Sequence, residues 1–436
     1  MLAKQEESRL CRSNQIPAMR RLLVVDSHYS FEAISERKLE ESIVCRDLNG
    51  FFDRVWSVHP FASLVTSDKW ANKFGRPEYY SLTPIHTFIE GKVGRFSLLS
   101  WFPALNFLIS QLNIICVLVR LIRKEGISVI RADEPQYNGL LGWILSRLCG
   151  IPLLLRVGNN HDKDYETTGR MSMPTLFKTR RIEKIIERFV LSRADCVAGA
   201  NQDNLNFAIS SGARPEVSTL FRYGNLIAKQ HFDQPVDRSD GRPLLSELGV
   251  DPKRFILTIA RLESLKHPDD VIRVLTEIRR RGHDFKAVIA GDGRLRDTLV
   301  ELASELGVED QVILCGNKDQ EWLARVIPLA TVVVSPFMGR ALSESALGAA
   351  PIVAYDVDWQ SELIQSGVTG ELVPYLDWEK MANSVEHFLL NPKYASSMGA
   401  AVRKRALEMM DPVILDQHER DIYHKLINDA DSPPIE

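Results

Sequence analysis

The sequence has few cysteines and lacks the common nucleotide-binding fingerprints. Its six cysteines are scattered through 436 residues, with no Cys-x-x-Cys pair and no histidine cluster. This usage is typical of reduced cysteines in the cytoplasm and argues against a disulfide framework or a zinc site. No Gly-x4-Gly-Lys-Ser/Thr stretch occurs, which excludes a P-loop. Repeats and low-complexity tracts are also missing, which excludes a solenoid or a disordered chain.

The whole chain has almost no net charge, but its two halves have net charges of opposite sign. The formal net charge is only −3, which points to no polyanionic partner such as a nucleic acid. Residues 1–230 contain 31 basic and 23 acidic residues, whereas residues 231–436 contain 23 basic and 34 acidic residues. The first half therefore has a net charge of +8 and the second half a net charge of −11. This asymmetry predicts an anionic partner, such as an inner membrane surface, for the first half, with chance clustering as the alternative.

Two segments bear on the location of the protein. The first twenty residues lack the apolar core of a signal peptide, so we expect a cytoplasmic protein that is peripheral on the membrane at most. Residues 96–119 contain no charge and are long enough to span a bilayer. Several polar residues and Pro103, which would kink or end a helix, favour instead a helix that is buried or lies at an interface.

Short runs of β-branched residues alternate with amphipathic stretches along most of the chain. Apolar runs such as Leu153–Val157 and Phe255–Ala260 are typical of strands buried on both faces of a parallel sheet. Their alternation with helical stretches predicts a doubly wound α/β fold. The chain is too long for one core, and residues 230–243 have the composition of a linker. We therefore predict two Rossmann-like domains whose parallel sheets face a central cleft.

Two loops after predicted strands have the chemistry of a phosphate site. Arg261 and Lys266 follow the strand 255–260, and an arginine fork with a lysine point charge suits a diphosphate. Two solvated loop cations would give the same pattern. Residues 290–299 (AGDGRLRDTL) form a glycine-rich turn into a helix. Alone, that turn is more often only a connection between strand and helix.

A third loop follows the strand 331–335. It contains Gly339 and leads into a helix predicted near Ser343, with Glu344 in the first turn. Free backbone N–H groups at such a helix start bind phosphate or sugar oxygens. A carboxylate there can accept hydrogen bonds from two ribose hydroxyls, or it can merely complement the helix dipole.

The joint order and spacing of these motifs resembles the retaining glycosyltransferases of family four (glycosyl transferases group 1), which have the GT-B fold. The family's Arg-x4-Lys corresponds to 261–266, and its AGDG-x-L-R corresponds to Ala290–Arg296. Its G-x-P-V-V-A corresponds to Ala349–Ala354, and its E-I-I-x-x-G-x-T-G-x-L-V-P to Glu362–Pro374. Front-half segments also resemble the family, namely 131–157, 193–204 and RYGN at 222–225.

The resemblance implies roles for particular residues. Residues 1–235 would form an acceptor-binding domain and residues 243–410 a donor-binding domain, with the helix 411–436 packing back on the first. Arg261 and Lys266 would hold the donor diphosphate and offset charge on the leaving group, and Glu344 would bind the donor ribose. Backbone contacts to phosphate and sugar would come from Gly339, Arg340, Ala341 and Leu342. The nucleobase would lie beside Gly316 and Asn317.

The sequence departs from the family at three places. Pro336 stands where the family has a second carboxylate that touches the transferred sugar. Residues 26–32 (DSHYSFE) replace the glycine-rich turn after the first strand. The family's histidine after the 153–157 strand is displaced, and His161 is the nearest match, with Asn160 and Asp162 as further acceptor-side candidates. His161 could assist the acceptor hydroxyl, or it could be a solvated loop histidine.

Other features have a simpler interpretation. Asp356-Val357-Asp358 looks like a metal-binding Asp-x-Asp, but the family resemblance implies no metal, and we expect none. His28, His59 and His86 lack ligand spacing and are expected to be structural or to line the acceptor cleft. Residues 177–191 form a basic amphipathic helix, which either lies on an anionic membrane or, more commonly, packs its apolar face on its own sheet.

Together these observations predict a retaining, metal-independent glycosyltransferase without a cofactor. It would move a sugar from a nucleotide-diphosphate sugar to a saccharide or a lipid-linked acceptor, in bacterial surface polysaccharide or lipopolysaccharide synthesis. Two alternatives stay open. One is a catalytically impaired binding subunit with the same fold, and the other is a nucleotide-sugar epimerase.

Overall fold

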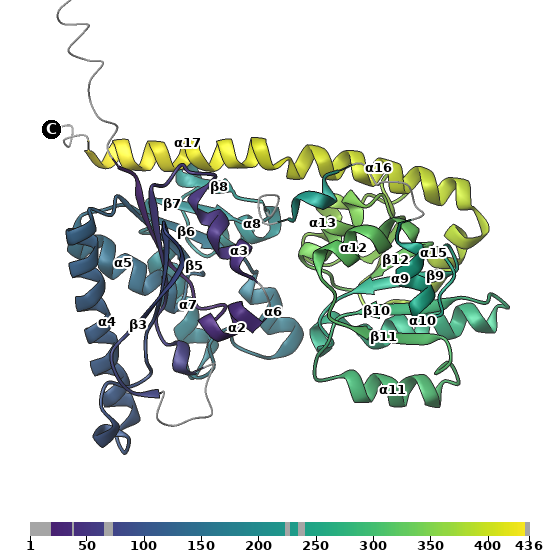
Figure 1. The fold of residues 1–436 in the computed structure, drawn as a ribbon, viewed down its shortest axis with the longest axis horizontal. Helices are drawn as coiled ribbons and strands as arrows, with labels where there is room; N and C mark the ends of the chain where they lie inside the picture. The colour runs from purple at the N-terminus through teal and green to yellow at the C-terminus, as the bar shows by residue number, and fades with distance from the viewer. Residues whose placement is uncertain (1–18, 37–38, 65–72, 223–226, 234–239, 432–436) are drawn as a thin grey trace, which may run out of the picture.

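The computed structural model describes residues 19–36, 39–64, 73–222, 227–233 and 240–431. In Figure 1 two lobes lie side by side, and a long C-terminal helix runs along the top of both. Each lobe is built on one sheet, so the two Rossmann-like domains predicted from the alternating pattern are confirmed. Parts of the predicted linker and of the RYGN turn (234–239 and 223–226) lie outside the described residues.

The N-terminal sheet has the strand order β3-β4-β2-β1-β5-β6-β7-β8. Every neighbouring pair is parallel except β3 and β4 at one edge. The strands are β1 (Arg21–Val25), β2 (Arg54–His59), β3 (Glu78–Thr83), β4 (His86–Glu90), β5 (Val129–Asp133), β6 (Leu153–Val157), β7 (Cys196–Gly199) and β8 (Ser218–Leu220). The helices of this lobe are α2 (Phe31–Glu36), α3 (Glu40–Val44), α4 (Pro103–Glu125), α5 (Tyr137–Cys149), α6 (His161–Thr168), α7 (Arg180–Leu191) and α8 (Gln202–Ser210).

The C-terminal sheet has the order β11-β10-β9-β12-β13-β14, and all its pairs are parallel. Its strands are β9 (Phe255–Ile259), β10 (Lys286–Ala290), β11 (Val312–Gly316), β12 (Val332–Ser335), β13 (Ile352–Tyr355) and β14 (Glu371–Val373). Its helices are α9 (Arg242–Glu247), α10 (Pro268–Arg280), α11 (Arg296–Glu305), α12 (Gln320–Val326), α13 (Arg340–Leu347), α14 (Gln360–Leu363), α15 (Trp378–Leu390) and α16 (Pro392–Met410).

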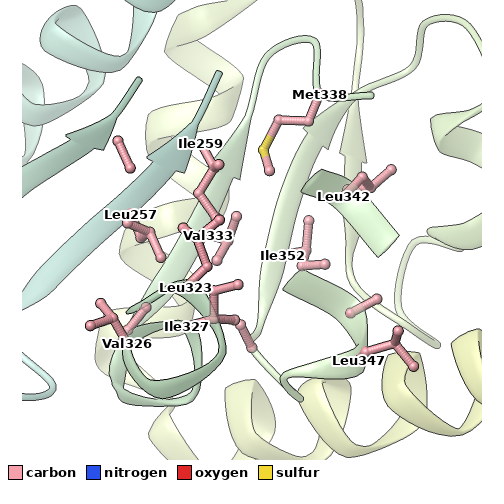
Figure 2. Close-up of a cluster of buried hydrophobic side chains, with 14 of the residues drawn as sticks. Leu257, Ile259, Leu323, Val326, Ile327, Val333, Met338, Leu342, Leu347 and Ile352 are labelled. Carbon is pink, nitrogen blue, oxygen red and sulfur yellow. The ribbon is translucent and has the colours of Figure 1, made fainter. Parts of the chain in front are cut away.

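Each sheet is covered on both faces, which is why central strands such as β9 and β12 are almost entirely apolar. In the C-terminal domain α12, α13 and α16 pack on one face, and α10, α11 and α15 pack on the other. Figure 2 shows the first of these clusters, in which Leu257 and Val333 of the sheet lie among Leu323, Ile327 and other helix residues. In the N-terminal domain α4, α5, α7 and α8 cover one face.

The other face of the N-terminal sheet is covered by the last helix, α17 (Pro412–Asp431). Tyr423 of this helix is fully buried, with its ring 5.0 Å from that of Phe52 and 6.1 Å from that of Phe221. Arg420 donates to the carbonyl of Leu48 at 2.6 Å. The chain thus leaves the C-terminal domain through α16 and returns to the domain in which it began.

The uncharged segment 96–119 forms a short 3₁₀ turn, Ser97–Leu99, and then most of α4. Pro103 occupies the first turn of α4 and begins the helix rather than ending it. Ile114, Leu118 and Ile122 pack into the core of the domain. By length and composition α4 is also apolar enough to cross a membrane. Only 33% of its most apolar window is buried inside the protein, so most of that window is not covered by the domain core.

The expectation that the helix at 177–191 packs its apolar face on its own sheet is wrong for its first half. Arg180, Glu183 and Glu187 are buried, whereas Ile182 and Ile185 are exposed. The Arg180 guanidinium binds Glu183 at 3.0 Å and Glu187 at 2.8 Å, and Gln136 donates to Glu187 at 2.7 Å. Because these charges find partners inside, the polar side of the helix turns inward and the isoleucines turn outward.

Candidate functional site

The carboxyl ends of both sheets face a cleft of about 640 Å³ between the domains. The loops after β9, β10, β11 and β12 line it from the C-terminal domain, and the loops after β1, β5 and β6 line it from the N-terminal domain. A second cleft of about 760 Å³ adjoins it and shares His28, Glu134, Asn159 and Arg261 with the first. Crevices at these strand ends are where open α/β sheets bind ligands.

Arg261 and Lys266 both line the main cleft, from the loop after β9. Arg261 is exposed and lies 3.3 Å from Glu263, whereas the Lys266 ammonium lies 4.1 Å from the centre of the Phe337 ring. Burial, followed by the charge of Arg261, lowers the pKa of Lys266 to about 8. Two cations in one confined loop suit a ligand that carries more than one negative charge.

The AGDG turn supports this loop directly. A Cβ atom at Gly291 would come within 1.9 Å of the carbonyl oxygen of Ala260, and one at Gly293 within 2.5 Å of that of Leu262. Leu262 donates its backbone N–H to the carbonyl of Asp292 at 3.0 Å. The glycines therefore let the loop after β10 pack against the loop that carries Arg261, a positioning role that the sequence alone left open.

Helix α13 begins at Arg340, three residues earlier than predicted, with Gly339 as its N-cap. No side-chain hydrogen bond caps this helix start, and an uncapped helix start beside a cleft is a candidate anion site. Gly339, Arg340 and Ala341 line the cleft as the resemblance implies. Leu342 is fully buried in the core and is not among the lining residues.

Glu344 lies in the second turn of α13 rather than in the first, because the helix begins earlier. Its side chain lines the cleft but is only 2% exposed as a residue. Oε1 lies 3.2 Å from Nε of Arg340 and accepts no hydrogen bond from the described residues. A buried carboxylate oxygen without a donor is costly unless a ligand hydroxyl supplies one.

The far end of the cleft is lined by the loop after β11. Asn317, Lys318 and Gln320 face it, whereas Gly316 does not. Gly316 instead accepts a hydrogen bond from the N–H of Gly291 at 2.9 Å, with φ of +72°, and so joins the two loops. Of the two residues predicted beside a nucleobase, the structure brings Asn317 to the cleft.

His161 lines the second cleft and is almost fully buried. Its Nε2 lies 2.7 Å from Glu134, and its Nδ1 lies 2.7 Å from the hydroxyl of Ser172. Burial opposes the imidazolium, but the Glu134 carboxylate outweighs burial and raises the pKa of His161. With both ring nitrogens engaged, His161 has no free nitrogen to accept a proton in this conformation.

The other two acceptor-side candidates line neither cleft. Asn160 caps α6 by accepting from the N–H of Lys163 at 3.2 Å, and its amide donates to Asp203 at 2.9 Å. Asp162 binds Arg180 at 3.0 Å and Lys184 at 2.9 Å, and these partners lower its pKa although burial opposes them. Both side chains hold α6 in place.

His28 is the residue in the cleft to which the sequence argument gave no definite role. It lines both clefts, is partly exposed, and contacts Asp26 at 2.5 Å. The Asp26 carboxylate, against the opposing effect of burial, raises the pKa of His28 to about 9. A further cation of the cleft thus comes from the DSHYSFE segment, where the Asp-x-His spacing after a buried strand is the available signal.

The other two histidines and the Asp-x-Asp motif show the effects of burial in their pKa values. His59 and His86 are fully buried, and burial lowers their pKa values to about 4 and about 3. Burial, followed by the charge of Asp203, raises the pKa of Asp358 to about 6. Among the described residues no group of three or more His, Cys, Asp or Glu side chains is arranged to hold a metal ion.

Comparison with known proteins finds similarity over part of the chain. Residues 246–405 match the family Glycosyl transferases group 1. The alpha-D-kanosaminyltransferase of Streptomyces kanamyceticus is 28% identical over 59% of the chain. A GDP-mannose-dependent alpha-(1-6)-phosphatidylinositol monomannoside mannosyltransferase of Mycolicibacterium smegmatis is 30% identical over 48% of the chain. The alignments cover 66% and 59% of these relatives, so the chain spans less than two thirds of their length.

Solved structures agree in fold over nearly the whole chain. Sucrose-phosphate synthase from Thermosynechococcus elongatus superposes with a TM-score of 0.72 at 18% identity, covering 94% of this chain and 99% of that one. HepE from Anabaena, in complex with UDP, gives 0.70 at 17% identity, covering 93% and 100%. Residues 246–405 are therefore similar to the glycosyl transferases group 1 family, and the whole chain has the two-domain fold of these solved structures.

Proposed function

We propose that the protein is a retaining glycosyltransferase that uses a nucleoside-diphosphate sugar as donor. The observation that carries the proposal is the cleft itself. It brings Arg261, Lys266 and the uncapped start of α13 together with the buried carboxylate of Glu344, whose Oε1 accepts no hydrogen bond from the described residues. Cations and helix N–H groups suit a diphosphate, and the carboxylate suits ribose hydroxyls. The second half of the chain is −11 overall, so diphosphate binding there depends on these local groups.

In the proposed reaction the bond between the anomeric carbon and the diphosphate oxygen breaks first. Lys266, Arg261 and the N–H groups of α13 stabilise the charge that develops on the diphosphate. The acceptor hydroxyl attacks from the same face and its proton passes to a leaving phosphate oxygen, so configuration is retained. These groups supply the positive charge that the leaving group needs, so the proposal includes neither a metal ion nor a cofactor.

The acceptor enters from the N-terminal domain, beside His28 and the second cleft. We propose a saccharide or a lipid-linked saccharide in bacterial surface polysaccharide synthesis, with the enzyme in the cytoplasm. Relatives named as acting on a phosphatidylinositol mannoside, and on D-inositol 3-phosphate, support an acceptor rich in hydroxyls. UDP bound to HepE and the GDP-mannose dependence of the mannosyltransferase leave both bases as donor candidates.

The test is a panel of UDP and GDP sugars scored by thermal stabilisation, followed by calorimetry with the best one. We expect stabilisation by one class of nucleotide sugar, and loss of binding in Lys266→Ala and Arg261→Ala. Lys380→Ala, which removes an exposed cation of α15, serves as the matched control. Unchanged affinity in both cleft variants would overturn the donor site.

A catalytically impaired binding subunit is the second candidate, favoured by Pro336. This residue replaces the carboxylate that the family places near the transferred sugar, and its carbonyl accepts a hydrogen bond from Gln360 at 3.3 Å. Such a subunit would bind the donor without ever consuming it. Release of free nucleoside diphosphate in the presence of acceptor excludes this candidate, and conversion of donor into a second nucleotide sugar without acceptor would indicate the epimerase instead.

A further inference from the structure

The outer side of the helical layer formed by α4, α5 and α7 is unusually apolar. These helices lie on one face of the N-terminal sheet, with α5 in contact with both α4 and α7. In Figure 1 α4 runs down the left edge of the molecule, and its N-terminal end lies at the lower left, away from the second domain. None of the exposed residues on this side lines either cleft, and neither the core nor the proposed reaction uses them.

Apolar side chains form a stripe along the exposed face of α4 and the turn before it. Leu98 is 90% exposed, Trp101 86% and Phe102 64%. The stripe continues at helical spacing with Leu105, Leu108 and Leu112. The opposite face of α4 is anchored in the core by Ile114, Leu118 and Ile122, so the helix lies flat on its domain. One large aromatic or aliphatic side chain in water is ordinary, but a contiguous row marks an interaction surface.

Helix α7 adds a second, independent apolar group on the same layer. Ile185 is 69% exposed and Ile182 44%, although the sequence pattern predicts that both face inward. Phe189 follows one turn later and is covered by the guanidinium of Arg193, 4.2 Å from the ring centre. The inward side of α7 is occupied by the buried ion pairs of Arg180, so rotating the helix to hide its isoleucines would break those pairs.

Exposed charges on these three helices are predominantly basic, although Lys184 is paired with Asp162 of α6 at 2.9 Å. The exposed basic residues on the three helices are Arg120, Arg123, Lys124, Arg147, Arg181, Lys184 and Arg188. Their only acidic residues are Glu125, which pairs with Arg54 at 3.6 Å, and Glu183 and Glu187, which are buried. Helix α5 contains no acidic residue. A partner that matches this surface must therefore provide an apolar region for the exposed apolar side chains and negatively charged groups for the basic residues.

We propose that this surface, defined by the exposed sides of 3₁₀ turn 97–99, α4 and α7, docks on an anionic phospholipid membrane. Trp101, Phe102 and the leucines of α4 would enter the interfacial layer, and the arginines and lysines would contact lipid phosphates. Helix α4 lies in the membrane plane and does not cross it, because its inner face belongs to the domain core. A lipid surface fits better than a protein, because the apolar row is flanked by basic residues over three helices.

The test is co-sedimentation of the full chain with vesicles of phosphatidylcholine alone or with 30% phosphatidylglycerol. We expect binding to the anionic vesicles that weakens as salt is raised, because the electrostatic share is screened. Replacing Leu98, Trp101 and Leu105 by serine should lower the partition coefficient at least tenfold. Serine at Leu390 and Val413, two exposed apolar residues on other surfaces, is the matched control and should bind as the parent does.

A second pair of variants probes α7 separately, so the proposal does not depend on one folded variant. Ile182→Ser with Ile185→Ser should reduce partition about fivefold, and Arg181→Gln with Arg188→Gln should reduce binding to anionic vesicles only. Arg280→Gln on α10 controls for general loss of positive charge. Nucleotide-induced thermal stabilisation of every variant should stay unchanged, since vesicle binding needs neither donor nor acceptor, and it reports that the variant is folded.

Two results would overturn the proposal. One is equal sedimentation of the parent and the serine variants with anionic vesicles. The other is a concentration-dependent dimer in light scattering that the serine variants abolish while vesicle binding is absent, which would assign the surface to a second copy of the chain. Loss of transferase activity with vesicle binding intact would count against the proposed transferase function and not against the proposed membrane surface.

Discussion

Lys266 offers the sharpest test of the donor site, because its ammonium is titratable near neutral pH. Burial and Arg261 lower its pKa to about 8 in the free protein. A hydrogen bond from a charged donor contributes about 2 kcal/mol, and we assign this contribution to the protonated form of Lys266. Because the diphosphate binds that form more tightly, its binding raises the pKa of Lys266.

The sign of the pH effect follows from this shift. Below pH 8 Lys266 is already charged, and affinity for UDP or GDP stays at its maximum. Above pH 8 the free protein must take up a proton to bind, so affinity falls as the pH rises. The total loss is about 30-fold, which is what 2 kcal/mol predicts. Lys266→Met should bind about 30-fold more weakly at pH 7 and lack this part of the pH dependence.

Calorimetric titrations at pH 7.0, 8.0, 9.0 and 9.5 measure the effect. His28 lines the same cleft, and its pKa of about 9 places a second titration in the same range. The pH dependence of affinity that remains in Lys266→Met therefore reflects the titration of His28. The further substitution His28→Gln should remove it. Superimposable pH profiles of the parent and Lys266→Met, with dissociation constants within about twofold of each other, would refute the reasoning.

Three further predictions concern the site, the domain interface and the buried histidines. Glu344→Gln should weaken UDP or GDP binding about tenfold and remove the preference for ribose over 2′,3′-dideoxyribose, measured by competition calorimetry. Glu362 accepts from Arg222 at 2.8 Å across the domains, so Glu362→Ala should lower the thermal midpoint by about 2–5 °C, against Glu371→Ala as control. His59 and His86 are held neutral with lowered pKa values, so stability should be full above pH 6.5 and fall as pH drops toward 4. His86→Gln should flatten that acid limb in urea titrations, and an unchanged limb would contradict the assignment.

Much of the fold follows from hydrophobic pattern. The bounds of β6 are those predicted, because LLLRV is a short, nearly continuous apolar run broken only by Arg156, which is typical of a strand buried on both faces. Strand β2 was not predicted, because its sequence RVWSVH includes Ser57 and His59, which are polar but buried. The partners of Ser57 lie outside the strand: the Arg46 guanidinium and the His86 ring are each 2.9 Å from its hydroxyl. A local pattern does not contain that information.

The candidate site likewise contains residues that could be predicted from the sequence and residues that could not. Arg261, Lys266 and the loop at Gly339 could be predicted because each follows a buried strand, and strand ends of one sheet share an edge. His161 could not be judged from its position, since Glu134 and Ser172, which engage both of its ring nitrogens, are remote in sequence. The inverted face of α7 has the same origin, because the partners of Arg180 decide which side turns inward.

The return of the last helix has a consequence for how the protein is made. Leu22, Val24 and Phe221 on one face of the first sheet depend on Tyr423 of α17 for their cover. A ribosome delivers that cover only after the entire second domain has been synthesised. The first domain to emerge is therefore the last to be completed, and until then it presents a bare apolar face on which nascent-chain chaperones can act.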